Sequence, residues 1–456
     1  LRASFNVTDY PEDIMFIHNR VSQLFDFEDL SKSAPAEVID KVSSYISAER
    51  EKEFNLSVPP LWRLKVFTCP GSMVILCWSF HHALLDGWSN SLLITELLGI
   101  YNNYNTGIKA STLLTSDSYI NYLAEQQIII RDTEAQEFWK KELDDYKFLE
   151  LPANTNTADN MPVEEYYLNF SSVLTGKLKN TAAELNTDLK AVYFSAFIYT
   201  LSMLAGDDDI LAGIVTNNRP LTDDGDRIAG CFLNTVPFRT NTNCSTWKEL
   251  IENISAGLKR IKKYEAFPFA EIVKLVKASA GTENPLFDVV FNFIDFNEYE
   301  QVYDDFSPAA NGITEYDIRG FENTNTALNF TVSATLGEHT LKISYNPRKT
   351  DAALVNRLAG YFERILIKEA DELSGIINNA EILSTDDKAL LNSINDTYKD
   401  FNINEPYHTL FSQAAKKHAN NTAVAAGNKK LTYSELDKLS DSFALHLGNN
   451  GAKKGT

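Results

Sequence analysis

A short apolar run that ends in two histidines constrains the fold of this chain more than any other stretch. The run Val74–Phe80 is rich in β-branched and aromatic side chains, which is typical of a buried strand. The segment Ser91–Tyr101 has apolar residues at helical spacing. Between them stands the polar stretch His81-His82-Ala-Leu-Leu-Asp86-Gly87. The order is therefore strand, turn and helix, and it places the turn's side chains at the rigid end of a strand.

The two histidines should play different parts. Neighbouring side chains on a strand point to opposite faces, so one ring is expected to face a cleft and the other the body of the domain. An imidazole can exchange protons near neutral pH, although a His-His pair is more often structural than catalytic. A metal site would need a third ligand, and no HExxH motif is present, so no metal is predicted. Asp86 could cap a helix, orient an imidazole or pair with an arginine.

Charge and cysteine content exclude several classes of function. The chain has 42 Lys and Arg against 62 Asp and Glu, and the resulting net charge of −20 argues against nucleic-acid binding. Four cysteines without a CxxC pair predict neither a disulfide framework nor a zinc site of that type. No apolar run approaches the roughly 20 residues that cross a bilayer, and no signal peptide begins the chain. We expect a cytoplasmic protein with no membrane partner.

The sequence divides into three parts. Residues 1–113 and 114–385 are expected to be two α/β lobes joined by a small polar connector near 109–118, and a new pattern fills 386–456. A cleft between two lobes is a common ligand site. The second lobe should contain helices near 119–146, 175–185, 189–204 and 247–263, and strands over Ile210–Val215, Phe287–Phe293, Ala327–Ser333 and Leu341–Tyr345.

Several motifs resemble one known family in the order in which that family carries them. The stretch His81–Gly87 resembles the His-His-x-x-x-Asp-Gly signature of condensation domains of nonribosomal peptide synthetases. Further motifs of the family resemble, in chain order, Leu1–Phe5, Ser118–Tyr122, Asn218-Arg219-Pro220, Gly230–Arg239, Tyr264–Phe269 and Asn284–Phe291. The resemblance at Ser118–Tyr122 is the weakest of these. Tyr264 stands where many members have histidine.

The resemblance implies a fold and a reaction. The expected fold is α/β, with two chloramphenicol-acetyltransferase-like lobes in a V around a central channel. The N-terminal lobe is expected to be incomplete, because the first strand and helix that members carry before the Leu-Arg motif are absent from this sequence. The reaction would be acyl transfer that makes a peptide bond: the amine of one carrier-bound aminoacyl group attacks a second carrier-bound thioester. Phosphopantetheine arms of the carriers would bring both substrates, and no cofactor would be bound directly.

The same resemblance assigns roles to individual residues. His82 is the expected base or hydrogen-bond partner of the attacking amine, and His81 and Asp86 would hold the turn in shape. A backbone N–H near Gly87 could stabilise the developing oxyanion. Asp86 is expected to form a structural salt bridge with Arg2, because a buried charge needs a partner. The expected channel-lining residues are Trp88, Ser89 and Asn234.

The tail resembles the start of an adenylation domain, through Tyr407–Phe411, Thr422–Ala425 and Leu431–Leu436. It ends before the Gly-rich phosphate loop of such domains, so no ATP chemistry is predicted for this stretch. Expected partners are an upstream donor carrier, a downstream acceptor carrier and the adjacent adenylation domain. The residues around the histidines favour an elongation type that joins an L donor to an L acceptor. The alternatives are an epimerization domain of the same fold and a noncatalytic scaffold that docks carriers.

Overall fold

The computed structural model describes residues 1–456 except for 7, 9, 11–13, 23–24, 107–118, 153–161, 223–224, 277–283, 296–319, 323–324, 335–336, 380, 401–403 and 456. The chain forms two compact units, Leu1–Ile382 and Leu383–Thr456. The predicted division after residue 385 lies close to this boundary. The predicted division after residue 113, the polar connector and Ser118 fall outside the described residues.

The first part of unit 1 contains two small sheets, and helix α1 (Pro35–Arg50) packs against one of them. Strands β1 and β2 pair antiparallel, and a three-stranded sheet has the order β3-β4-β5, with β4 parallel to β3 and antiparallel to β5. The elements are β1 (Ala3–Asn6), β2 (Ile14–Ile17), β3 (Phe25–Asp29), α1 (Pro35–Arg50), β4 (Trp62–Thr68) and β5 (Val74–Phe80). The buried side chains of Val38 and Val42 on α1 join Leu30 and Phe67 in a small core.

Strand β5 has the bounds that the sequence predicts, but it is less buried than expected. Val74 is 52% exposed and Leu76 is 40% exposed. Among the described strands, β5 pairs with β4 alone and forms one edge of the sheet. The apolar run therefore reflects a strand with one accessible face, and the expectation of a buried strand is wrong on that point.

Helix α2 (Gly87–Thr106) begins four residues earlier than the apolar spacing indicates. The carboxylate of Asp86 accepts the backbone N–H of Ser89 at 2.7 Å, which satisfies one of the donors that a helix start leaves unpaired. The helical stretch predicted near 119–146 is divided into α3 (Tyr119–Ile129) and α4 (Thr133–Glu142). The division lies at Asp132, whose side chain caps α4.

A six-stranded sheet forms the centre of the second part of unit 1, with the order β6-β11-β10-β9-β7-β8. Strand β9 runs parallel to both β10 and β7, and the other neighbours pair antiparallel. Its strands are β6 (Glu164–Asn169), β7 (Asp209–Asn217), β8 (Leu233–Asn241), β9 (Val289–Ile294), β10 (Leu328–Ser333) and β11 (Thr340–Tyr345). All four strands that the sequence predicts in this lobe are therefore present.

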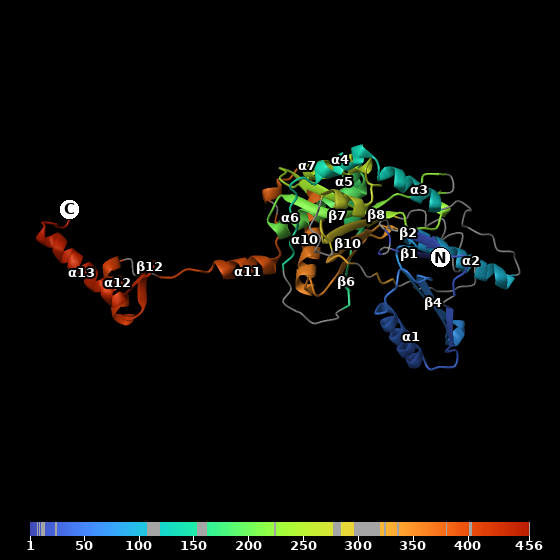
Figure 1. The fold of residues 1–456 in the computed structure, drawn as a ribbon, viewed down its shortest axis with the longest axis horizontal. Helices are drawn as coiled ribbons and strands as arrows, with labels where there is room; N and C mark the ends of the chain where they lie inside the picture. The colour runs from blue at the N-terminus through green and yellow to red at the C-terminus, as the bar shows by residue number, and fades with distance from the viewer. Residues whose placement is uncertain are drawn as a thin grey trace. The chain divides into compact units, whose positions relative to one another are not determined.

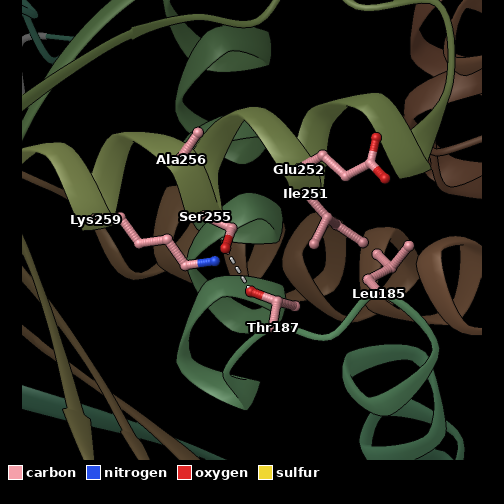
Figure 2. A pocket seen from close by; sticks show the side chains of 7 residues that line it. All are labelled: Leu185, Thr187, Ile251, Glu252, Ser255, Ala256 and Lys259. Carbon is pink, nitrogen blue, oxygen red and sulfur yellow. Dashed lines mark hydrogen bonds between the residues drawn. The ribbon is translucent and has the colours of Figure 1, made fainter.

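Helices pack around this sheet and enclose the main core (Figure 1). They are α5 (Ser172–Glu184), α6 (Leu189–Ala205), α7 (Trp247–Lys262), α8 (Phe269–Val276) and α10 (Ala352–Asp371). Helix α6 is apolar on nearly all sides because it contacts α5, α7 and α10 as well as the sheet. A shallow pocket lies between the α5–α6 turn and α7, where Thr187 donates a hydrogen bond to Ser255 (Figure 2).

Unit 2 contains three helices and a two-stranded sheet among its described residues. They are α11 (Thr385–Asn395), α12 (Tyr407–Lys417), β12 (Thr422–Ala426), β13 (Lys429–Thr432) and α13 (Tyr433–Asn449). Helices α11 and α13 each begin with a capping box, formed by Ser384 with Asp387 and by Thr432 with Glu435. Across the described part of the chain, every helix is too short or too polar to span a bilayer.

Candidate active site

Asp86 is the most completely bonded residue of the His-His turn. It is 1% exposed, and both of its carboxylate oxygens lie 2.9 Å from Nη2 of Arg219. Besides the Ser89 N–H described above, the carboxylate accepts the backbone N–H of Phe232 at 3.2 Å. A buried carboxylate with this set of donors is a structural anchor, because its lone pairs are already used.

The arginine that pairs with Asp86 is Arg219, not the expected Arg2. Arg219 follows β7 in the second lobe, and its Nη1 also donates to the carbonyls of Gly225 and Ile228. Its guanidinium lies 4.3 Å from the centre of the Phe232 ring. Arg2 is exposed and donates to the carbonyl of Asn19 at 3.0 Å. The prediction failed because several arginines could supply the charge, and only the fold brings Arg219 into the buried site.

Ser89 and Trp88 also reach the second lobe. Ser89 is 0% exposed, and its Oγ donates to the carbonyl of Gly230 at 2.7 Å and accepts the N–H of the same residue at 3.0 Å. The indole N–H of Trp88 donates to the carbonyl of Asp226 at 2.7 Å. The expectation that Ser89 lines a channel is therefore wrong, since its side chain is buried in the contact between the lobes.

Gly230 shows how closely this contact is packed. A Cβ at this position would overlap the ring of Tyr119, whose hydroxyl donates to the carbonyl of Cys231 at 2.6 Å. Tyr119 and Tyr122 pack against Phe232. The weakest of the motifs, around Tyr119, thus contacts the Gly230–Arg239 motif of the second lobe.

His81 faces the body of the first lobe. Its backbone N–H donates to the carbonyl of Leu61 at 3.0 Å, and its Nδ1 accepts the N–H of Ala83 at 3.0 Å. The ring meets the edge of Phe54. Burial lowers the pKa of His81, and the charge on His82 lowers it further. His81 therefore holds the turn through its bonded backbone and ring, on the side that the alternation of strand side chains predicts.

His82 lies on the other side of the turn and remains accessible, with 46% of its side chain exposed. Its Nδ1 lies 3.2 Å from the carbonyl of Leu85, and its Nε2 lies 2.9 Å from Oε1 of Glu322. The hydrogen bond to Glu322 raises the pKa of His82, and partial burial opposes it. The same bond lowers the pKa of Glu322. This ring can hold or move a proton at a position that solvent or substrate can reach.

Glu322 is the residue of this site that sequence reasoning missed. It precedes β10 in the second lobe, far along the chain from the histidines. The polar residues beside it resemble an ordinary loop, so no local signal marks it. Arg219 was visible in the Asn-Arg-Pro motif, but its pairing with Asp86 was not.

Gly87 and Asn234 complete the set of expected site residues. Gly87 is exposed, and beyond its chain neighbours no heavy atom lies within 4 Å of where its Cβ would be. The side-chain amide of Asn234 donates to the carbonyls of Glu265 and Phe267, both at 2.8 Å. Asn234 thus fixes the turn between α7 and α8, and the structure gives it no contact with His82.

A metal centre is not evident in the described part of the chain. No group of three or more His, Cys, Asp or Glu side chains there is arranged to hold an ion. The titratable pair that the turn presents is His82 with Glu322.

Residues 1–392 match the family model of the condensation domain. Bacitracin synthase 3 of Bacillus licheniformis is 26% identical over the whole chain, which spans only 7% of that relative. A four-domain nonribosomal peptide synthetase bound to AMP and glycine superposes with a TM-score of 0.72 at 18% identity, over 99% of this chain and 35% of the other. The epimerization domain from the third module of tyrocidine synthetase B gives 0.63 at 16% identity, over 82% and 86%. These likenesses confirm the expected α/β fold.

Proposed function

The chain belongs to the condensation-domain family, and from this premise we propose that unit 1 forms a peptide bond between two carrier-bound substrates. The α-amine of an acceptor aminoacyl thioester attacks the carbonyl carbon of a donor thioester. The new C–N bond replaces the donor C–S bond, and the donor carrier leaves as a free thiol. The amine gives up one proton, and the departing thiolate takes one up.

His82 is the group that we assign to this proton transfer. Its position at the end of β5, its accessible ring and its bonded Nδ1 support the assignment. Because a carbonyl only accepts, Nδ1 carries a proton and Nε2 is the nitrogen that can receive one from the amine. The anchored Asp86–Arg219 pair holds the turn so that Nε2 keeps its direction.

The backbone beside Gly87 could take part in the same step. The open space at this residue leaves room for a substrate to approach the start of α2. A backbone N–H at a helix start favours negative charge, so it suits the oxyanion of a tetrahedral intermediate. Trp88 and Asn234 remain candidates for the walls of the substrate passage, although the contacts described above already occupy their polar atoms.

The wider assignment rests on the sequence motifs around the histidines and in the tail. We propose an elongation type that joins an L donor to an L acceptor, with phosphopantetheine-bearing carriers as its partners. Unit 2 would be the beginning of the adjacent adenylation domain. A cytoplasmic location is part of the same proposal.

The test uses the complete synthetase module with both carriers loaded. We expect His82→Ala to slow formation of the dipeptidyl carrier by roughly 10²–10⁴-fold, the usual contribution of a general base. His408→Ala is the matched control, because it removes an exposed ring from unit 2. Intact-mass measurement of the carriers follows the product. A His82→Ala module with wild-type turnover would disprove the assignment.

Epimerization is a second candidate, and the likeness to the tyrocidine epimerization domain favours it. An imidazole and a carboxylate 2.9 Å apart could remove and return a proton at the α-carbon of one substrate. A single carrier loaded with an L-aminoacyl group separates the two reactions. Chiral chromatography of the released amino acid would show a D product only if this chain epimerizes.

A further inference from the structure

We propose that Glu322 is a positioning residue that fixes the ring of His82 and holds it in its charged form between turnovers. This inference rests on the proposed function, because it concerns the group assigned to proton transfer. The carboxylate Oε1 lies 2.9 Å from Nε2, on the nitrogen that would face the acceptor amine. Glu322 comes from the second lobe and His82 from the first, so the pair forms across the two lobes.

Both ring nitrogens of His82 face acceptors. The Leu85 carbonyl at Nδ1 can only accept, and an ionised carboxylate at Nε2 can only accept as well. The arrangement that satisfies both partners is the imidazolium, with a proton on each nitrogen. In this state the ring cannot serve as a base. Nε2 must lose its proton to solvent before it can take one from the amine, and Glu322 raises the pH at which that happens.

The segment around Glu322 is attached to the first lobe at a second point. The preceding residue, Phe321, places its ring 4.2 Å from the guanidinium carbon of Arg50 at the end of α1. A cation over an aromatic face is a favourable contact even at exposed sites. The Phe321–Arg50 contact and the Glu322–His82 contact, made by adjacent residues, both hold this segment against the first lobe.

The effects of the other charged groups near the His82–Glu322 pair can be distinguished from the effect of Glu322 by mutation. Asp86 acts on His82 in the same direction as Glu322, but at longer range and as part of the buried anchor. The pKa of the neighbouring His81 is lowered by burial and by the charge on His82, so its shift is opposite to that of His82. Lys342 on β11, whose ion pair is with Glu165, adds a smaller electrostatic effect that lowers the pKa of Glu322. Glu322 is therefore the group whose removal should change the charge state of His82 most directly.

The first experiment measures the titration of His82 itself. NMR of the full chain with isotope-labelled histidine rings follows each ring with pH, and His82→Ala identifies the signal of His82. We expect Glu322→Gln to move the midpoint of this titration to lower pH. Glu338→Gln is the matched control, since it makes the same change at an exposed position. Equal midpoints in the wild type and in Glu322→Gln would overturn the proposal.

The second experiment separates this role from the proposed reaction. In the loaded module, the rate of peptide-bond formation is measured against pH. The acidic limb of this profile should shift to lower pH in Glu322→Gln, because His82 becomes neutral at a lower pH. A merely structural role would lower the rate at every pH and leave the limb in place, and that result would count against Glu322. The proposed function is tested separately: it fails if His82→Ala keeps its activity, whatever the NMR titration of Glu322→Gln shows.

Discussion

The two ends of the His-His turn are built in opposite ways. At one end, Asp86 and Ser89 are buried and bonded to the second lobe through Arg219 and Gly230. At the other end, His82 is half exposed and contacts the second lobe through one carboxylate. Only three residues lie between His82 and Asp86 along the chain. A single motif can thus combine a buried, fully bonded contact, here called the joint at Asp86, with a histidine that remains accessible for chemistry. Mutations at each end can test the two parts separately.

The largest expected effect is at the buried end. Asp86→Ala leaves the guanidinium of Arg219 without its partner, which should lower the free energy of unfolding of unit 1 by roughly 3–5 kcal/mol. Urea titration followed by tryptophan fluorescence measures this, because all five tryptophans lie in unit 1. The double variant with Arg219→Ala should lose less than the sum of the two single variants. Simple additivity would show that the pair is not coupled.

Ser89→Ala should have the next largest effect. It removes a hydroxyl that exchanges hydrogen bonds with both backbone groups of Gly230 and accepts one from Arg219. Leaving buried partners unsatisfied costs about 1–3 kcal/mol, measured by the same urea titration. Activity should fall only as far as folding does. If Ser89→Ala lost activity at full stability, the serine would belong to the reacting site after all.

At the exposed end, the His82–Glu322 pair should contribute only modestly to stability and in a defined pH range. The pKa of His82 is raised, so its contribution is present below its ordinary value of 6.5 and is lost as the pH rises through the raised value. The pKa of Glu322 is lowered, so the stability that Glu322 contributes is fully present above its ordinary pKa of 4.5. That stability is lost as the pH falls below 4.5 and through the lowered pKa. Wild type should therefore exceed Glu322→Gln by roughly 0.2–1 kcal/mol near pH 6 and by less near pH 9. The opposite trend in paired urea titrations would contradict this assignment.

The smallest effect is expected for Arg2→Ala. The side chain is exposed and its described hydrogen bond goes to a backbone carbonyl, so the free energy of unfolding should change by less than about 0.5 kcal/mol. A loss comparable to that of Asp86→Ala would restore Arg2 as the partner of the buried aspartate. Arg2→Ala and Asp86→Ala each remove one charged side chain, so the difference between their free energies of unfolding compares an exposed charge with the buried one.

The sequence predicted local features of the site well. The strand before the histidines, the opposite directions of His81 and His82, and the polar turn before a helix all follow from residues within a few positions of one another. The family resemblance is confirmed by the match of residues 1–392 to the condensation-domain model. These features depend on periodicity and on short motifs, which a single sequence displays directly.

What the sequence could not predict depends on contacts between distant segments. Arg2 and Arg219 are equally plausible partners for Asp86 until the fold brings one of them into the buried site. Ser89 is small and polar, and only its packing against Gly230 distinguishes an interior serine from one that lines a passage. Glu322 carries no motif at all. The exposure of Val74 and Leu76 likewise depends on which faces of the sheet are covered, and not on their apolar character.

The joint at Asp86 also limits how the two lobes can move. The side chains of Asp86, Trp88 and Ser89 each form a hydrogen bond with a residue between 219 and 232, so the start of α2 is fixed to the segment that follows β7. Any movement that keeps these three bonds would carry the turn and residues 219–232 together, so the imidazole would keep its orientation relative to the segment that anchors its turn.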